Sequence, residues 1–307
     1  MLTVRDLAKR YGQVPALAGI DLEVPAGRIV GFLGPNGAGK TTAMRCIMGL
    51  AVPDAGSVRW QGRPVDRRAR LRFGYMPEER GLYPRMRIGD QLVHFARLSG
   101  LSRTDARRAC ARWLERFDLG DRTRARLDEL SHGNQQRVQL AAALVHDPAV
   151  AVLDEPFSGL DPIAVGTMAG CLRELADAGT AILFSSHQLD LVEDICQDVV
   201  VIDDGRVVLS GELDELRSRS NRRILQVRVG GAVWSPPIPA TLFAALPGGH
   251  GGDGGDGGNV GDGRRFVVDR RIDLARILDA ALAAGEVDSF SFEPPSLSDL
   301  FGEAVSR

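Results

Sequence analysis

The chain contains 307 residues, a length that suits one large domain and one small one. Hydrophobic residues make up 44% of the chain and charged residues 25%, as is typical of a soluble globular protein. The formal net charge of −2 provides no overall basic field, so we expect no nucleic-acid partner.

The sequence contains no obvious targeting or membrane segment. No apolar run approaches the roughly 18 residues that a membrane span needs, and no signal peptide opens the chain, so we expect a cytoplasmic protein. The four cysteines are scattered without metal-ligand spacing and are expected to be buried free thiols. They are Cys46, Cys110, Cys171 and Cys196.

The first 33 residues predict short strands. Residues 2–7 and 20–24 alternate apolar and polar side chains, and residues 28–33 form an apolar run. Tyr11 falls in the loop expected between the first two strands. A tyrosine there is usually a packed aromatic, but ahead of a phosphate-binding loop it could instead stack on a nucleobase.

Residues 34–42, GPNGAGKTT, match the phosphate-loop pattern G-x-x-x-x-G-K-[ST]. The fixed positions are Gly34, Gly39, Lys40 and Thr41. An apolar strand precedes the segment and a helix over residues 42–50 is expected after it, so backbone N–H groups and the helix N-terminus would form a nest for phosphate oxygens. Lys40 is one of only two lysines in an arginine-rich chain, which suits a compact ammonium placed between phosphates. The alternative is a Gly-rich turn that binds no ligand.

Apolar strands alternate with helices beyond this loop. Strands are expected at residues 57–60, 73–76, 149–153, 181–187, 199–202 and 207–209. Residues 88–130 predict an all-helical insertion, and a helix over 131–145 follows behind a serine cap. A further helix is expected from residue 162 to about 178. This alternation predicts an α/β core with a mostly parallel sheet.

The composition changes after about residue 220. We therefore expect a large domain over residues 1–220, with its helical part at about 88–145, and a small α+β domain over 221–307. Strands are expected there at residues 223–229 and 266–268, and between them lies the Gly-rich segment 248–263, which contains Gly-Gly-x-Gly-x-Asp. A calcium-binding β-roll needs this pattern in tandem with an apolar position that is missing here, so a flexible linker is expected and calcium binding is the alternative.

Five motifs follow one another along the chain. They are the phosphate loop at 34–42, the segment Ser131-His132-Gly133-Asn134-Gln135, the pair Asp154-Glu155, the segment Ser158-Gly159-Leu160-Asp161, and His187. With these motifs in this order, the chain resembles the ATP-binding subunit of ABC transporters over about residues 1–220. The resemblance implies a P-loop NTPase core with an antiparallel β subdomain and a helical insertion.

The resemblance also implies ATP as the nucleotide and Mg²⁺ as its ion. Asp154, with Thr41 and Glu78, would hold Mg²⁺, which prefers carboxylate and water oxygens. Glu155 would be the general base that orients the attacking water, and His187 would reach the γ-phosphate. The family usually has Gln at the position of Glu78, so this chain adds a negative charge near the phosphates. Taken alone, paired acids at a strand end are often only a helix start, and a lone histidine is often a capping or core residue.

A set of nucleotide contacts follows from the same resemblance. These are Tyr11, Gly34, Asn36, Gly37, Gly39, Lys40, Thr41, Thr42, Ser131, Gly133, Gln135 and Asp161. The segment 131–135, with Leu130 before it, is similar to the family signature Leu-Ser-Gly-Gly-Gln. Ser131, Gly133 and Gln135 match it, whereas His132 and Asn134 depart from it, Asn134 mildly because Asn tolerates positive φ. In the family this segment caps the ATP of a second subunit, and the Asp161 loop communicates across the dimer.

The implied assembly is a head-to-tail dimer closed by two ATP molecules, a homodimer rather than a heterodimer, with an integral membrane permease subunit. The chain would lie peripherally at the inner face of the cell membrane. Residues 77–84 and the tail 293–301 resemble the corresponding segments of a subgroup of the family that serves drug- and ion-export systems. The cargo does not follow from these segments. The alternatives are an ABC ATPase that acts on DNA or ribosomes, a nucleotide-binding regulator without turnover, and a substrate importer.

Overall fold

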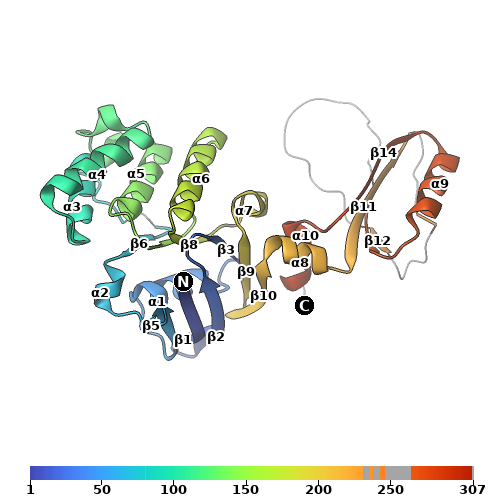
Figure 1. The fold of residues 1–307 in the computed structure, drawn as a ribbon, viewed down its shortest axis with the longest axis horizontal. Helices are drawn as coiled ribbons and strands as arrows, with labels where there is room; N and C mark the ends of the chain where they lie inside the picture. The colour runs from blue at the N-terminus through green and yellow to red at the C-terminus, as the bar shows by residue number, and fades with distance from the viewer. Residues whose placement is uncertain (80, 231–235, 238–242, 246–263, 306–307) are drawn as a thin grey trace. The chain divides into compact units, whose positions relative to one another are not determined.

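The structure is a computed structural model that describes residues 1–79, 81–230, 236–237, 243–245 and 264–305 (Figure 1). The chain divides into two compact units. The first comprises Met1–Leu213 with Phe301–Arg307, and the second comprises Asp214–Leu300. The boundary along the chain thus lies at Leu213, somewhat before the residue 220 at which the composition changes. Over the described residues, no helix has both the length and the apolar character needed to cross a membrane.

A six-stranded sheet in the order β10-β9-β3-β8-β7-β6 forms the centre of the first unit. Its strands are β3 (Ile29–Leu33), β6 (Phe73–Met76), β7 (Val150–Leu153), β8 (Ala181–Ser185), β9 (Asp198–Asp203) and β10 (Arg206–Glu212). All neighbours in it are parallel except β9 and β10. Every residue of β3, β7 and β8 is buried, which explains their continuous apolar sequences and confirms the α/β core.

A second, antiparallel sheet has the order β2-β1-β4-β5. It contains β1 (Leu2–Tyr11), β2 (Val14–Val24), β4 (Ala55–Trp60) and β5 (Arg63–Pro64). The prediction that the first strand ends at Leu7 and leaves Tyr11 in a loop is wrong, since β1 continues to Tyr11, which pairs with Val14. The reason is an irregularity at Asp6, whose φ of 48° shifts the register and breaks the alternation of side chains.

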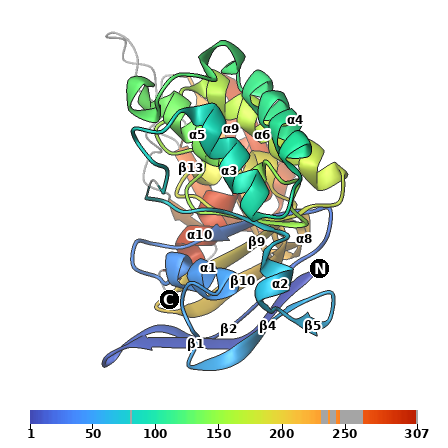
Figure 2. The ribbon, with the colours of Figure 1, turned by 90° about the vertical axis from the view of Figure 1, so that its left-hand side faces the viewer.

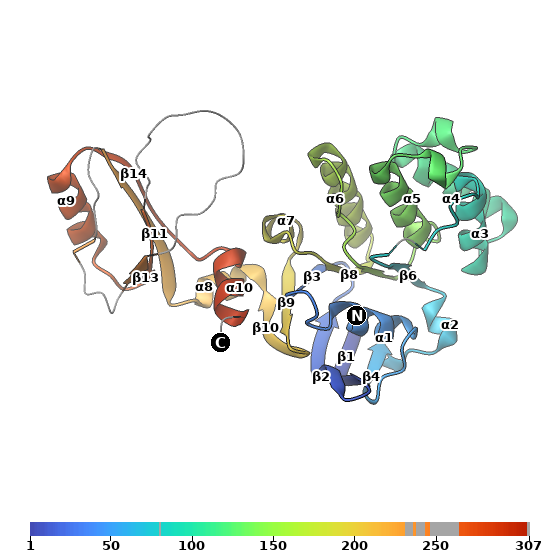
Figure 3. The ribbon, with the colours of Figure 1, turned by 180° about the vertical axis from the view of Figure 1, so that it is seen from behind.

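One hydrophobic core joins the two sheets around α1 (Lys40–Met48). It contains Val4 and Leu22 from the antiparallel sheet, Met44 from α1, and Phe32 and Val152 from the parallel sheet. Figure 3 shows α1 beside the strands β1, β2 and β4. The helix that leaves the phosphate loop is therefore fixed on both sides by apolar packing, which holds the loop in place.

The helical insertion contains α3 (Ile88–Leu98), α4 (Arg103–Arg116) and α5 (His132–Leu144), which gather together in Figure 2. Two short 3-10 turns, Gly120–Arg122 and Leu127–Glu129, connect α4 to α5. Serines cap α4 and α5, because Ser102 accepts from the N–H of Asp105 and Ser131 from that of Asn134. The apolar face expected in this region is buried, as predicted. Its members are Ala106, Cys110, Trp113, Leu114 and Phe117.

Four further helices complete the description up to residue 219. They are α2 (Arg67–Arg70), α6 (Pro162–Asp177), α7 (Leu189–Ile195) and α8 (Leu213–Arg219). All four cysteines are free and buried, as expected. Burial raises the pKa of the thiols of Cys110 and Cys171 to about 11, so these groups stay protonated near neutral pH.

The second unit is a small α+β domain built on a four-stranded antiparallel sheet of order β12-β13-β11-β14. The strands are β11 (Arg222–Val229), β12 (Phe243–Ala245), β13 (Arg264–Asp269) and β14 (Val287–Glu293), and the helix between β13 and β14 is α9 (Leu274–Ala284). The last helix, α10 (Leu297–Val305), begins in the second unit and ends in the first. Ile277 and Ala281 of α9 pack on Leu225 and Phe266. Sequence analysis did not predict β12 or α10. The Gly-rich segment 248–263 lies outside the described residues.

The close contact between β6 and α5 yields a stability prediction. A Cβ added at Gly74 would lie 2.2 Å from the carbonyl oxygen of Ala143, so Gly74→Ala should lower the free energy of unfolding by about 1–3 kcal/mol. The matched control is Gly166→Ala in α6, where an added Cβ would meet no atom within 4 Å and should stabilise the helix by about 0.5–1 kcal/mol. Chemical denaturation without nucleotide measures both, and equal effects of the two changes would contradict the contact.

Candidate active site

A pocket of about 300 Å³ lies where the parallel strands end. Its walls come from the β3–α1 loop, the start of α1, the loops after β6 and β7, and the start of β2. The residues that line it are Ala16, Asn36, Gly37, Gly39, Lys40, Thr41, Thr42, Glu78, Asp154 and Glu155. The structure thus brings together most of the predicted phosphate-loop residues and three of the four predicted acidic ones, Glu78, Asp154 and Glu155. Asp161 and His187 are not among the residues that line the pocket. Ala16 was not predicted, because nothing in its local sequence marks it.

Steric limits determine the shape of the phosphate loop. A Cβ at Gly34 would lie 2.2 Å from the carbonyl oxygen of Ile202, and one at Gly39 would lie 2.4 Å from that of Ala16. Gly39 also has a φ of 109°, which L side chains rarely adopt, and it directly precedes α1. Only glycine fits at these two positions. The loop therefore delivers the free N–H groups of the first turn of α1 to the pocket.

Lys40 is the cation of the pocket. Its ammonium donates hydrogen bonds to the carbonyl oxygens of Gly34 and Pro35, at 2.7 and 3.1 Å. These bonds hold the side chain across the loop, so that the positive charge stays within the pocket. A compact ammonium with three donors can keep such backbone contacts and still attract an anion.

Asp154 ends β7 and is almost fully buried, with 1% of its surface exposed. Its Oδ1 accepts a hydrogen bond of 2.6 Å from the hydroxyl of Ser185 in the next strand, β8. Its Oδ2 is buried and has no hydrogen-bond partner among the described residues. A carboxylate oxygen that lacks a partner beside a phosphate loop fits a hydrated cation, and Thr41, whose side chain carries a hydroxyl, lines the same pocket. The donor set therefore fits Mg²⁺.

Glu155 follows Asp154 and has a left-handed backbone, with a φ of 49°. Its N–H donates to the hydroxyl of Ser185 at 2.9 Å, and its Oε2 lies 2.9 Å from Nδ1 of His187. Burial raises the pKa of the Glu155 carboxyl above its usual value of 4.5, while the charge and hydrogen bond of His187 and the charge of Lys40 oppose that rise. The geometry provides a partly desolvated carboxylate with a histidine beside it, which is an arrangement suited to a general base.

The segment 131–135 does not line this pocket. Ser131 caps α5, and the side-chain amide of Gln135 donates to the carbonyl oxygen of Leu130 at 2.9 Å. Counted from Leu130, the fifth signature position is Asn134 and Gln135 follows it. Asp161 caps α6 by accepting from the N–H of Ala164 at 2.9 Å. Ser131 and Asp161 are exposed, so both are accessible to a partner molecule.

Tyr11 is not among the residues that line the pocket. Its side chain is 51% exposed, and the ammonium of Lys9 lies 5.6 Å from the centre of its ring. Stacking of Tyr11 on a nucleobase therefore stays a prediction. Sequence analysis missed Ser185, although a serine at the end of an apolar strand next to the acidic pair could have been noticed.

Comparison with known proteins identifies the family of this chain. The chain is 37% identical over 317 residues to an uncharacterised ABC transporter ATP-binding protein, YhaQ of Bacillus subtilis, and the match covers 99% of this chain and 98% of the relative. The chain belongs to the ABC transporter ATP-binding proteins. The family model described as "ABC transporter" matches residues 17–158. The chain is therefore an ATP-binding and ATP-hydrolysing subunit.

Other members with printed functions are also similar. Identity is 34% to the daunorubicin resistance ATP-binding protein DrrA3 of Streptomyces coeruleorubidus, over 98% of this chain and 94% of the relative. Identity is 41% to the Nod factor export ATP-binding protein I of Burkholderia orbicola, and this match covers 67% of this chain and 69% of the relative. A solved ATP-binding subunit of an ABC transporter superposes with a TM-score of 0.67 at 32% identity, over 71% of this chain and 92% of that one. The ABC ATPase fold is thereby confirmed.

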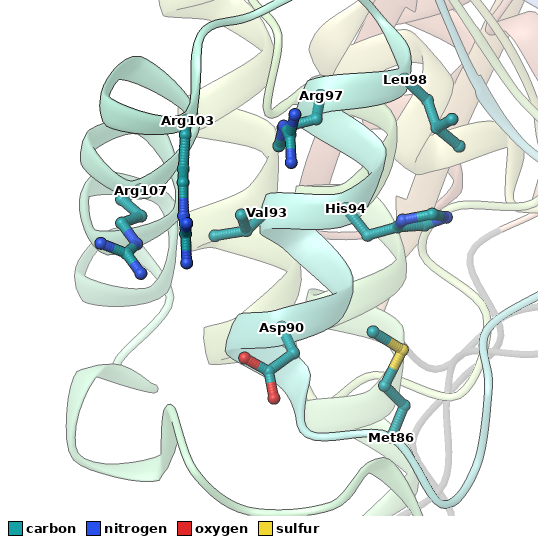
Figure 4. Close-up of a pocket in the computed structure, with 8 residues that line it drawn as sticks. All are labelled: Met86, Asp90, Val93, His94, Arg97, Leu98, Arg103 and Arg107. Atoms are coloured by element: carbon teal, nitrogen blue, oxygen red, sulfur yellow. The ribbon is translucent and has the colours of Figure 1, made fainter.

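A second depression, of about 660 Å³, lies on the helical insertion of this ABC subunit and is called the arginine groove here. It is lined by Met86, Asp90, Val93, His94, Arg97, Leu98, Arg103 and Arg107. In Figure 4, the side chains of Arg103 and Arg107 extend from α4 on the side that faces Val93, while Arg97 and Asp90 project from α3. In the described part of the chain, Arg97, Arg103 and Arg107 form no ion pair, and Asp90 is the one acidic residue that lines the groove, so the groove carries a net positive charge.

The raised pKa of Glu155 predicts the pH dependence of hydrolysis. A general base works only when unprotonated, so kcat should fall on acidification with an apparent pKa above 4.5. His187→Ala removes interactions that lower this pKa, so the acid limb of the residual single-turnover activity should move to higher pH. His94→Ala in the arginine groove is the control and should leave the limb in place. An acid limb at or below pH 4.5, or one unmoved in His187→Ala, would contradict this assignment.

Proposed function

We propose that this ABC subunit hydrolyses ATP as a head-to-tail homodimer and thereby drives a membrane exporter. One observation carries the proposal: the segment 131–135, which is similar to the family signature, does not meet the phosphate-loop pocket within one molecule. The phosphate loop and acidic residues line one pocket, whereas Ser131 and the exposed start of α5 lie outside it. A second copy, turned head to tail, supplies the missing half to each site.

Each residue of the site has a proposed role. Lys40 and the N–H groups of the phosphate loop bind the β- and γ-phosphates. Glu155 accepts a proton from the attacking water as that water is positioned in line with the γ-phosphate. His187 contacts the γ-phosphate once nucleotide is present. The partner's α5 then presents its serine hydroxyl and its N-terminal N–H groups to the same phosphate, which adds donors where negative charge has to be stabilised.

The proposed metal is Mg²⁺, held by Asp154 and Thr41 with a contribution from Glu78. When bound, it neutralises charge on the β- and γ-phosphates. Among the described residues, no three His, Cys, Asp or Glu side chains lie close enough to hold a metal by themselves. Mg²⁺ usually combines one or two protein ligands with phosphate oxygens and water, and that is the set available here.

Export is the proposed direction of transport. The relatives that match this chain include proteins named for daunorubicin resistance and for Nod factor export, and the former matches through the small C-terminal domain as well. We infer a drug, antibiotic or ion as the class of cargo, and a separate membrane subunit as the partner. The chain would lie at the cytoplasmic face of the membrane, bound to that subunit.

The arginine groove is the proposed docking site of an acidic cytoplasmic segment of the membrane subunit. The unpaired charges of Arg97, Arg103 and Arg107 complement carboxylates, and exposed Leu98 offers apolar contact at its edge. Met86 of the groove lies in the same segment between β6 and α3 as Glu78, so a partner seated there can affect the active site.

Size-exclusion chromatography tests the dimer. Glu155→Gln keeps the shape of the side chain but removes its basicity, so hydrolysis should slow by about 10²–10⁴-fold and a dimer should accumulate with ATP but not with ADP. Adding Ser131→Arg should abolish that dimer without weakening ATP binding to the monomer. The control is Ser102→Arg, which removes the equivalent cap of α4 and should leave the dimer intact. A monomer with bound ATP in the Glu155→Gln variant at high concentration would contradict the proposal.

Co-purification tests the arginine groove. A chain with Arg97→Glu, Arg103→Glu and Arg107→Glu should lose the membrane protein that the unchanged chain retains in detergent, because the charges would then repel acidic groups. The control is Arg63→Glu, Arg67→Glu and Arg68→Glu, three exposed positions outside the groove, which should retain it. ATP affinity should be equal in both. The assignment would be overturned if only the control variant lost the membrane protein while the groove variant retained it. It would also be overturned if no membrane protein co-purified with the unchanged chain.

A further inference from the structure

Three glutamines are buried in the described part of the chain, namely Gln91, Gln136 and Gln139, with 0, 5 and 3% of their surfaces exposed. The side-chain amide of each donates to backbone carbonyl groups in the two loops that leave the sheet at the active-site edge. Buried amides are costly unless they are paired, so these bonds identify specific partners. The partners are the loop after β6, which carries Glu78, and the loop after β7, which carries Glu155.

Gln136 holds the backbone of Glu155. Its Nε2 donates to the carbonyl oxygens of Glu155 and Pro156, at 3.3 and 3.1 Å. On the other side, the N–H of Glu155 donates to Ser185. Glu155 has the left-handed φ of 49°, a conformation that non-glycine residues rarely adopt without support. The two hydrogen bonds hold both ends of this residue and thereby set the direction of its carboxylate.

Gln139 and Gln91 hold the loop after β6 at two points. Gln139 Nε2 donates to the carbonyl oxygen of Pro77 at 2.7 Å, one residue before Glu78. Gln91 pairs with the N–H and carbonyl of Tyr83 and with the carbonyl of Met86, at 2.9, 2.9 and 3.0 Å. The segment that carries Glu78 is thus tied to α5 at its start and to α3 at its end.

Gln136 and Gln139 lie on the same helix as Ser131. They are three residues apart, so they project from one face of α5, and Ser131 caps the start of that helix. We propose that Gln136 and Gln139 are positioning residues that transmit the docking of the signature serine onto the partner's ATP to Glu155 and Glu78 of their own chain. Because α5 is one continuous hydrogen-bonded element, a shift of its first turn displaces both carbonyl contacts together. The inference rests on the proposed dimer and on the proposed role of Glu155.

A purely structural role would favour a different side chain. Oε1 of Gln139 is buried and has no hydrogen-bond partner among the described residues, which counts against stability. Methionine would fill a similar volume without that cost. The polar group at this position is therefore explained by its bond to Pro77 next to Glu78.

Steady-state kinetics with Gln136→Met and Gln139→Met tests the inference. Each variant should lose about tenfold to a hundredfold in kcat, because Glu155 or Glu78 is no longer held in its productive position, while ATP affinity stays unchanged. The control is Thr180→Val, which removes another buried bond to a backbone carbonyl, that of Pro148, away from the active-site edge. Thr180→Val should lower thermal stability by a comparable amount and leave kcat unchanged.

A double-mutant cycle separates positioning from general damage. If Gln136 acts through Glu155, adding Gln136→Met to Glu155→Gln should lower kcat no further. Three results would overturn the inference. They are a further tenfold loss of kcat in the double mutant, a kcat in both methionine variants equal to that of Thr180→Val, and a fall in ATP affinity parallel to the fall in kcat. Absence of hydrolysis by the unchanged chain would instead contradict its function as an ATPase.

Discussion

The carboxyl ends of four neighbouring parallel strands determine where the active site lies. Lys40 follows β3, Glu78 follows β6, the Asp154-Glu155 pair follows β7 and His187 follows β8, and these strands are adjacent in the order β3-β8-β7-β6. Parallel strands place these ends at one edge, so residues far apart in sequence line one pocket, and His187 contacts Glu155 beside it. The core around α1 and the glycine contacts of the phosphate loop serve to keep this edge rigid.

The charges at that edge explain why nucleotide and metal bind together. Glu78, Asp154 and Glu155 line the pocket with Lys40 as its cation, so the site is acidic before a polyphosphate enters. Bringing the phosphates of ATP beside three carboxylates is unfavourable unless a cation is placed between them. The unpaired Oδ2 of Asp154 is positioned to hold such a cation. Glu78 makes this requirement stronger than a neutral glutamine would.

The sequence predicted the phosphate loop, the acidic pair and the alternation of strands and helices because those features depend on local chemistry and periodicity. It did not predict the continuation of β1 to Tyr11, since the left-handed Asp6 interrupts the alternation. It also could not predict that Gln136 and Gln139 contact the active-site loops. Those bonds depend on where the carbonyl groups of distant loops lie after folding, and an Ala- and Leu-rich helix carries no sign of them.

Mixing two inactive variants would test most directly whether each site is built from two chains. Lys40→Ala lacks the phosphate contact but keeps Ser131, whereas Ser131→Arg keeps Lys40 and blocks the signature. Each alone should hydrolyse no ATP. In a mixed dimer, Lys40 of one chain faces Ser131 of the other and completes one site, so the mixture should regain measurable ATPase activity. A mixture that forms mixed dimers yet stays as inactive as its components, or full activity of Ser131→Arg alone, would contradict the two-chain site.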